Sequence, residues 1–139
     1  MSYAAVKIVD VMKKPPITVQ PTSSVLDAVK IMHKEGISSV IVTSPEGKVI
    51  GIFTERDVVR IIAEGKSLHT MIGEVMTKEP LTIHEGEPLS KAVILMTEKK
   101  IRHIPVVDEE GKVKGMLSVR DIAAAYKKYL EHLEEIGGE

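Results

Sequence analysis

The 139-residue chain lacks cysteine and tryptophan, and its only aromatic residues besides histidine are one Phe and three Tyr. Without cysteine it has neither disulfide bonds nor a thiolate nucleophile, which fits a reducing compartment. So few aromatic rings provide no stacking platform for the bases of single-stranded nucleic acid. Lys and Arg number 19 against 20 Asp and Glu. No excess of either charge therefore favours nucleic acid or an anionic membrane as a partner.

Long apolar segments are also missing. The N-terminal sequence MSYAAVKIVDVMKK has no apolar stretch long enough for a signal peptide, and no segment approaches the length of a membrane span. The composition, 43% hydrophobic and 28% charged, is typical of a globular protein, and the length suits one ordinary domain. We therefore expect a cytoplasmic protein with neither membrane nor nucleic acid as its partner.

Motifs that would indicate catalysis are absent too. The chain contains no H-E-x-x-H, no G-x-S-x-G, no Walker-type loop and no G-x-G-x-x-G. The five histidines do not have the spacing of metal ligands: they are His33, His69, His84, His103 and His132. We therefore expect no catalytic residue, no metal site and no cofactor, so the protein is predicted not to be an enzyme.

The main positive feature is an internal repeat. Residues 8–58 align without a gap with residues 72–122, and 18 of the 51 pairs are identical, where average composition would give about three. Both copies keep a glycine late in a predicted strand, Gly51 and Gly115, where a missing side chain permits close approach of a ligand or of backbone. A tandem duplication with only two copies predicts a pseudo-two-fold pair that shares one core.

Each copy has the periodicity of a βαββα unit. Short alternating strands are predicted in PPITVQP and EPLTIHE, amphipathic helices in SSVLDAVKIMHKEG and EPLSKAVILMTEKK, and hairpins around the turns SPEGK and DEEGK, each followed by a second helix. Ser24 with Asp27 predicts a capping box, and Gly36 a helix end. The predicted class is α/β of the α+β type, with repeats at 8–63 and 72–126, a connection at 64–71 and a helical tail at 127–139.

A hydroxyl-x-x-Asp motif occurs where a strand passes into a helix in both copies, in GIFTERD and in GMLSVRD. Thr54 with Asp57, and Ser118 with Asp121, have the spacing of an N-terminal capping box. The same position offers free N–H groups and a positive helix end to a phosphate, and an Asp there can accept hydrogen bonds from ribose hydroxyls. The spacing alone does not separate capping from binding.

The paired motifs VM…P(I/L)T(V/I), GKVIGIFTERDVV and IRHIPVVDEEGKVKGMLSVRDI resemble those of the CBS domain, the module named after cystathionine β-synthase. The resemblance covers residues 8–123 and both copies. It implies a stand-alone CBS pair that acts as a regulatory sensor of AMP or of a related ligand, such as ADP, ATP or S-adenosylmethionine. It further implies a homodimer, and any client protein would bind in trans.

The resemblance also implies two nucleotide-binding clefts. In the cleft of Asp121 the carried-over residues are Asp121 and Ser118 for ribose and phosphate, Arg102 and His103 for phosphate, and Pro16, Ile17 and Thr18 around the base. In the cleft of Asp57 they are Asp57 and Thr54, with Pro80, Leu81 and Thr82 around the base. Two further arginines, Arg56 and Arg120, are candidates either for phosphate or for a salt bridge with a neighbouring acid.

The two clefts are not expected to bind phosphate equally well. The second copy has Arg102 and His103 where the first has Ser38 and Ser39, so the Asp121 cleft is the better candidate for holding phosphate. An alternative from another class stays open: the hydroxyl-x-x-Asp motifs only cap helices, and the chain is a ligand-independent dimerisation or scaffold module that acts on a partner protein.

Overall fold

A computed structural model describes residues 6–136 and confirms the order of elements predicted for both copies. The first copy contains β1 (Thr18–Val19), α1 (Val25–Glu35), β2 (Ser39–Thr43), β3 (Val49–Thr54) and α2 (Glu55–Ala63). The second contains β5 (Ile83–His84), α4 (Leu89–Lys99), β6 (His103–Val107), β7 (Val113–Ser118) and α5 (Val119–Ile136). Three short elements were not predicted: η2 (Ile8–Asp10), α3 (Ile72–Val75) and β4 (Thr77–Lys78).

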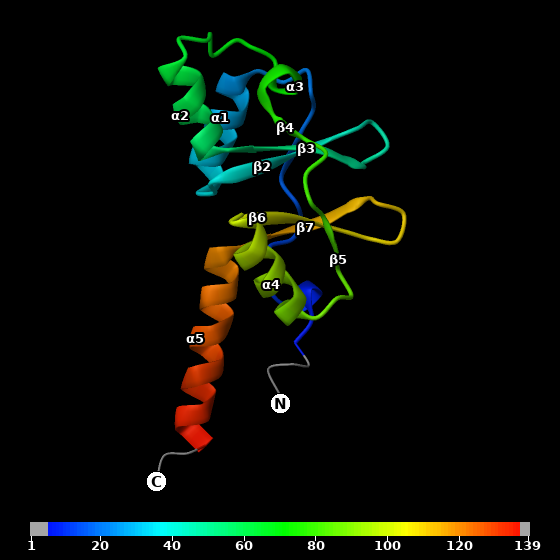
Figure 1. Cartoon of the computed structure of the whole chain (residues 1–139), viewed down its shortest axis with the longest axis vertical. Helices are drawn as coiled ribbons and strands as arrows, with labels where there is room; N and C mark the ends of the chain where they lie inside the picture. The colour runs from blue at the N-terminus through cyan, green and yellow to red at the C-terminus, as the bar shows by residue number, and fades with distance from the viewer. Residues whose placement is uncertain (1–5, 137–139) are drawn as a thin grey trace.

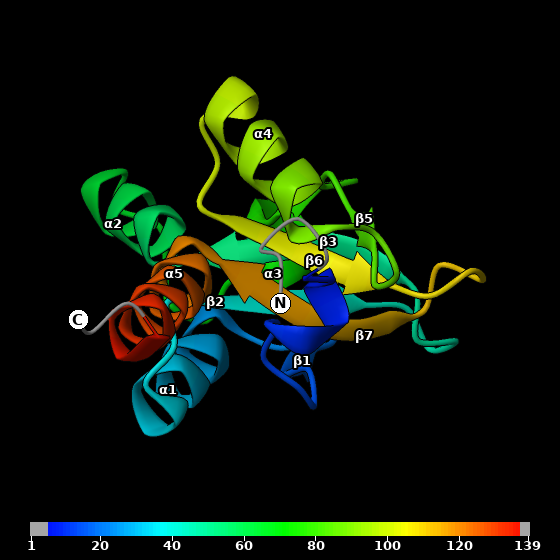
Figure 2. The same ribbon diagram turned by 90° about the horizontal axis from the view of Figure 1, so that it is seen from below.

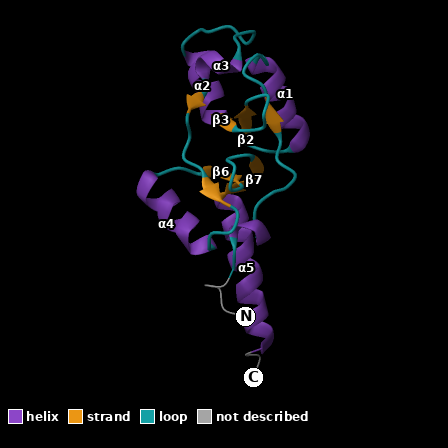
Figure 3. Ribbon diagram, turned by 90° about the vertical axis from the view of Figure 1, so that its right-hand side faces the viewer, coloured by secondary structure: helices purple, strands orange, loops and turns teal. Residues whose placement is uncertain are grey.

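The strands form two sheets that face each other across the middle of the molecule, with helices on the outer sides (Figures 1 and 3). One sheet has the order β1-β2-β3-β4 and the other the order β5-β6-β7. The β2–β3 and β6–β7 hairpins extend to the same side of the molecule (Figures 1 and 2), and the N–H of Val113 donates to the carbonyl of Gly47 at 3.0 Å. The two copies therefore meet through their strands.

The segment that leads into each copy packs against the other copy. Ile8 and Met12 belong to the apolar core of the second copy, whereas Ile72 and Val75 belong to the core of the first. The backbone shows the same exchange, because β4 pairs with β3 of the preceding copy. The predicted single shared core is therefore wrong. Each sheet packs its own helices and one exchanged segment into a separate core.

Local signals placed the helices correctly. The N–H of Asp27 donates to Oγ of Ser24 at 3.0 Å, and the N–H of Ser24 donates to Oδ2 of Asp27 at 3.4 Å, so the predicted capping box is present. Gly36 ends α1 with φ of 64°, a left-handed conformation that glycine adopts without strain. The predicted apolar faces of α1 and α4 are buried, including Met32 and Met96.

Gly51 and Gly115 occupy equivalent positions in the two copies, and at each of them an exchanged segment approaches the strand closely. A Cβ atom at position 115 would lie 2.7 Å from the carbonyl oxygen of Lys13 and 2.7 Å from Sδ of Met12. Lys13 is fixed there, since it exchanges two backbone hydrogen bonds with Met116 in β7, of 2.9 and 3.1 Å. At Gly51 the corresponding neighbour is the side chain of Met76.

Replacing Gly115 with Ala should destabilise the protein by about 1–3 kcal/mol, the usual cost of overpacking a well-fitted interior. The new methyl group meets a backbone carbonyl that is hydrogen-bonded in place. Gly51→Ala is the matched control, and we expect a smaller loss because the flexible Met76 side chain is able to move aside. Urea unfolding followed by circular dichroism measures both. Equal losses of stability in the two variants would contradict the view that the fixed Lys13 carbonyl, and not the nearby methionine side chain, limits the space at Gly115.

Candidate functional site

A cleft lies where the segment before β1, the start of β2 and the β7–α5 junction meet. It is lined by residues of both copies: Lys13, Pro15, Pro16, Ile17, Gly36, Ile37, Ser38 and Ser39 from the first, and His103, Met116, Ser118, Arg120 and Asp121 from the second. The exchange of segments creates this cleft, because it places the residues that follow Met12 beside β7. The cleft has apolar walls and a polar end at the start of α5.

The junction between β7 and α5 has the geometry of a capping box. Oδ2 of Asp121 accepts hydrogen bonds from the backbone N–H of Ser118 at 2.8 Å and from its hydroxyl at 2.9 Å. The N–H of Asp121 donates to Oγ of Ser118 at 3.2 Å. Within residues 6–136, no donor reaches Oδ1 of Asp121. One carboxylate oxygen therefore caps the helix, and the other makes no hydrogen bond to residues 6–136.

His103 links the two copies at the side of the cleft. Its Nε2 lies 2.8 Å from Oγ of Ser38. Burial is the main cause that lowers the pKa of His103 below 6.5; the nearby Arg102 charge acts in the same direction, while Asp121 and Glu55 oppose it. Burial therefore favours the neutral imidazole, which lies within hydrogen-bonding distance of the other copy.

A second hollow adjoins the cleft and shares part of its lining. Its lining residues are Ser38, Glu55, Arg102, His103, Ser118, Val119 and Arg120. Of the residues predicted for the Asp121 cleft, Pro16, Ile17, His103, Ser118 and Asp121 line the cleft itself, and Arg102 lines the adjoining hollow. Thr18 lines neither; it is exposed and pairs with Ile41 as part of β1. Arg120 lines both spaces.

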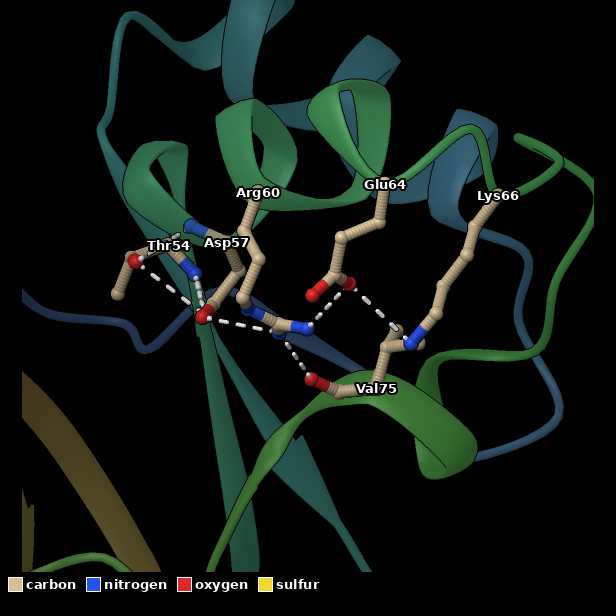
Figure 4. Close-up of polar contacts among 6 residues, drawn as sticks. All are labelled: Thr54, Asp57, Arg60, Glu64, Lys66 and Val75. Carbon is tan, nitrogen blue, oxygen red and sulfur yellow. Dashed lines mark hydrogen bonds and ion pairs between the residues drawn. The ribbon is translucent and has the colours of Figure 1, made fainter.

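The corresponding junction in the first copy has the same cap but a different surrounding (Figure 4). Oδ2 of Asp57 accepts from the N–H of Thr54 at 2.9 Å and from its hydroxyl at 3.2 Å. Oδ1 of Asp57 lies 3.4 Å from Nη2 of Arg60, which also donates to the carbonyl of Val75 at 3.0 Å. Arg60 was not among the predicted site residues, although its spacing of three from Asp57 along a helix is a typical ion-pair signal.

The residues predicted to surround the base in the first cleft belong to the segment that leads into the second copy. Pro80 is half-buried, whereas Leu81 and Thr82 are exposed, on the segment between β4 and β5. For Arg56 and Arg120, a salt bridge with a neighbouring acid was one candidate role, but among residues 6–136 neither takes part in an ion pair. Both are exposed.

Two further findings concern the described part of the chain. Between residues 6 and 136, no three His, Asp or Glu side chains gather closely enough to hold a metal ion. None of the helices in that range combines the length and the apolar character needed to cross a membrane.

The family of the chain follows from comparison with known proteins. The CBS domain model matches residues 8–64 and 72–128. The chain belongs to the CBS domain family. The CBS pair is 34% identical over 117 residues to the L-aspartate semialdehyde sulfurtransferase of Methanocaldococcus jannaschii, and this match covers 84% of the chain but only 22% of that enzyme.

Solved structures of other CBS pairs have the same fold. The CBS domain pair of protein MJ0100, in complex with 5′-methylthioadenosine and S-adenosyl-L-methionine, superimposes with a TM-score of 0.84 at 32% identity, covering 89% of this chain and 98% of that one. CBSX2 in complex with AMP gives a TM-score of 0.81 at 25% identity, with coverage of 90% and 98%. Both of these relatives bind adenosine ligands.

The environment of His103 predicts how stability depends on pH. Since the pKa is lower in the folded chain than the ordinary value of 6.5, the unfolded chain binds more protons when the pH falls through that value. The folded state should therefore lose stability on acidification from pH 7.5 to pH 5.5. His103→Gln keeps a polar group beside Ser38 but does not titrate, so its melting temperature should fall less over the same interval. A fall in the variant as large as that in the unmodified protein would contradict the assignment.

Proposed function

We propose that this CBS pair is a regulatory module that binds an AMP-type adenosine ligand in the Asp121 cleft. The observation that carries the proposal is that Asp121 lines a cleft shared by both copies, while its capping bonds with Ser118 use only Oδ2 of the carboxylate. A carboxylate with one free oxygen is suited to accept hydrogen bonds from the hydroxyls of a ribose. The adenosine ligands of the related CBS pairs support the same ligand class.

The phosphate would lie at the N-terminal end of α5. The first turn of a helix has backbone N–H groups without intrahelical partners and a partial positive charge, both favourable to an anion. Arg120 lines the cleft at this end, and Arg102 lines the adjoining hollow. Lys13 adds a third basic side chain to the lining. Glu55 in the hollow is the acidic group that a longer phosphate chain would approach.

The base would lie between the apolar walls of the same cleft. Pro16 and Ile17 come from the exchanged segment, Ile37 from the connection between α1 and β2, and Met116 from β7. Together they provide a largely apolar slot of the kind that buries a planar ring and leaves polar recognition to a few groups at its ends.

Regulation follows from the position of the cleft between the copies. A ligand that touches both copies binds more tightly to the arrangement that brings both sets of contacts together, so it shifts the population toward that arrangement. We propose that the protein acts in this way in the cytoplasm without catalysis or a cofactor, as a homodimer, with any client protein bound in trans.

A second candidate function is a ligand-independent dimerisation or scaffold module. The observation that favours it is the apolar surface of the outer helices. Val59 and Ile62 on α2 are 67% and 62% exposed, and Ile94 on α4 is 55% exposed. Such side chains suit contact with another protein or with a second copy of this chain. This function would need no occupant in the Asp121 cleft.

Thermal denaturation with AMP, ADP, ATP and S-adenosylmethionine distinguishes the two functions. A ligand present at a thousand times its Kd adds about 4 kcal/mol of apparent stability, so at least one of the four should raise the melting temperature by several degrees. Flat curves for all four at millimolar concentration would exclude the sensor and favour the scaffold.

Asp121→Ala, with Ser24→Ala as its control, separates ligand binding from helix capping. Both substitutions remove one member of a capping box, so each should lower the stability of the free protein by about 1 kcal/mol. Only Asp121→Ala should also reduce the shift produced by the nucleotide, because Ser24 is not among the residues that line the cleft. A full nucleotide shift in Asp121→Ala, measured in the same thermal assay, would show that this site assignment is wrong.

A further inference from the structure

The two capping carboxylates differ in what their second oxygen contacts. In the first copy, Arg60 holds Oδ1 of Asp57 at 3.4 Å, and the same guanidinium lies 3.5 Å from Oε1 of Glu64 (Figure 4). Its Nη2 also donates to the carbonyl of Val75 at 3.0 Å, which ties α2 to α3. Asp57 is largely buried, with 15% of its side chain exposed, while Arg60 is 41% exposed. A partly exposed guanidinium is therefore paired with a carboxylate that is mostly buried.

The second copy has no counterpart of this arginine. At the repeat offset of 64 positions, Arg60 corresponds to Ala124, Glu64 to Lys128, and Val75 to Val11. Ala124, Lys128 and Val11 line a hollow together with Asp121. The space that the Arg60 side chain fills beside Asp57 is thus open beside Asp121.

We infer that the residue at this position, Arg60 in one copy and Ala124 in the other, determines which cleft binds the nucleotide more tightly. This inference rests on the proposed function. A ribose that approaches Asp57 competes with Arg60 for Oδ1, since Oδ2 already accepts two hydrogen bonds from Thr54. A ribose that approaches Asp121 meets a free Oδ1. Because Arg60 is partly exposed and the pair is long, the resulting preference for the Asp121 cleft is up to about fivefold.

The difference in affinity that Arg60 causes between the two clefts is separate from the difference that Arg102 and His103 cause. Those residues act on phosphate at the polar end of the Asp121 cleft, whereas Arg60 acts on the sugar site of the other cleft. The contact of Arg60 with the Val75 carbonyl also matters, because it holds the guanidinium to the protein backbone. An arginine anchored in this way competes with the ligand for the carboxylate instead of following the ligand's phosphate.

Single-cleft backgrounds test the inference with AMP and S-adenosylmethionine as probes in equilibrium dialysis. In Asp121→Ala only the Asp57 cleft remains, and adding Arg60→Ala should tighten ligand binding by up to about fivefold. In Asp57→Ala only the Asp121 cleft remains, and adding Ala124→Arg should weaken binding by a similar factor, since the hollow beside Ala124 has room for the new side chain. Glu64→Ala, added to Asp121→Ala, is the matched control: it removes a contact of Arg60 but leaves the Asp57 pair, so affinity should change less than twofold.

Each result has a definite meaning. Tighter binding with Arg60→Ala and weaker binding with Ala124→Arg support the inference. Unchanged affinity with Arg60→Ala overturns the inference and leaves the proposed function intact. A loss of affinity does the same, because it would show that Arg60 contacts the phosphate of the ligand. Binding of neither probe to the unmodified protein would overturn the proposed function and this inference with it. Circular dichroism of each variant shows whether the fold is retained, and Arg60→Gln replaces Arg60→Ala if it is not.

Discussion

The exchange of leading segments between the two copies is the constraint on which the rest of the structure depends. Lys13 pairs with Met116 in β7, and β4 pairs with β3 in the matching way. Each crossing passes over a glycine whose missing side chain makes the contact possible. The same crossing carries Pro16 and Ile17 to the mouth of a cleft whose polar end belongs to the other copy. The same exchanged segments therefore complete the cores and form one wall of the candidate site.

Capping and binding do not compete at the start of α5, because a carboxylate has two oxygens. Oδ2 of Asp121 satisfies the N–H and hydroxyl of Ser118, which fixes the rotamer of the carboxylate. The fixed rotamer leaves Oδ1 in place before any ligand arrives, and a preorganised acceptor avoids part of the entropy cost of binding. A capping side chain with only one acceptor atom would have to give up its capping hydrogen bonds in order to bind a sugar.

The sequence predicted what depends on local chemistry and missed what depends on distant segments. Ser24, Asp27 and Gly36 define α1 through contacts within a few residues, so their roles follow from spacing. The exchange of Ile8 and Ile72 joins residues far apart in the chain, and an apolar residue at those positions fits its own copy as well as the other. The 2.8 Å contact of Ser38 with His103 was missed for the same reason, because it spans 65 positions. The spacing of Arg60 from Asp57 indicates an ion pair, but its bond to the carbonyl of Val75 joins α2 to a segment 15 positions away and does not follow from local spacing.

Duplication explains how one chain came to have two similar junctions with unequal surroundings. The strand glycine, the hydroxyl and the Asp are kept in both copies because the crossing backbone and the helix start require them in both. The next turn of the helix is under no such requirement, so Arg60 and Ala124 were free to differ. A protein with two identical clefts responds to its ligand over one concentration range. Under the proposed function, two clefts that share the backbone geometry but differ in one guanidinium would bind the ligand with different affinities without any change of fold.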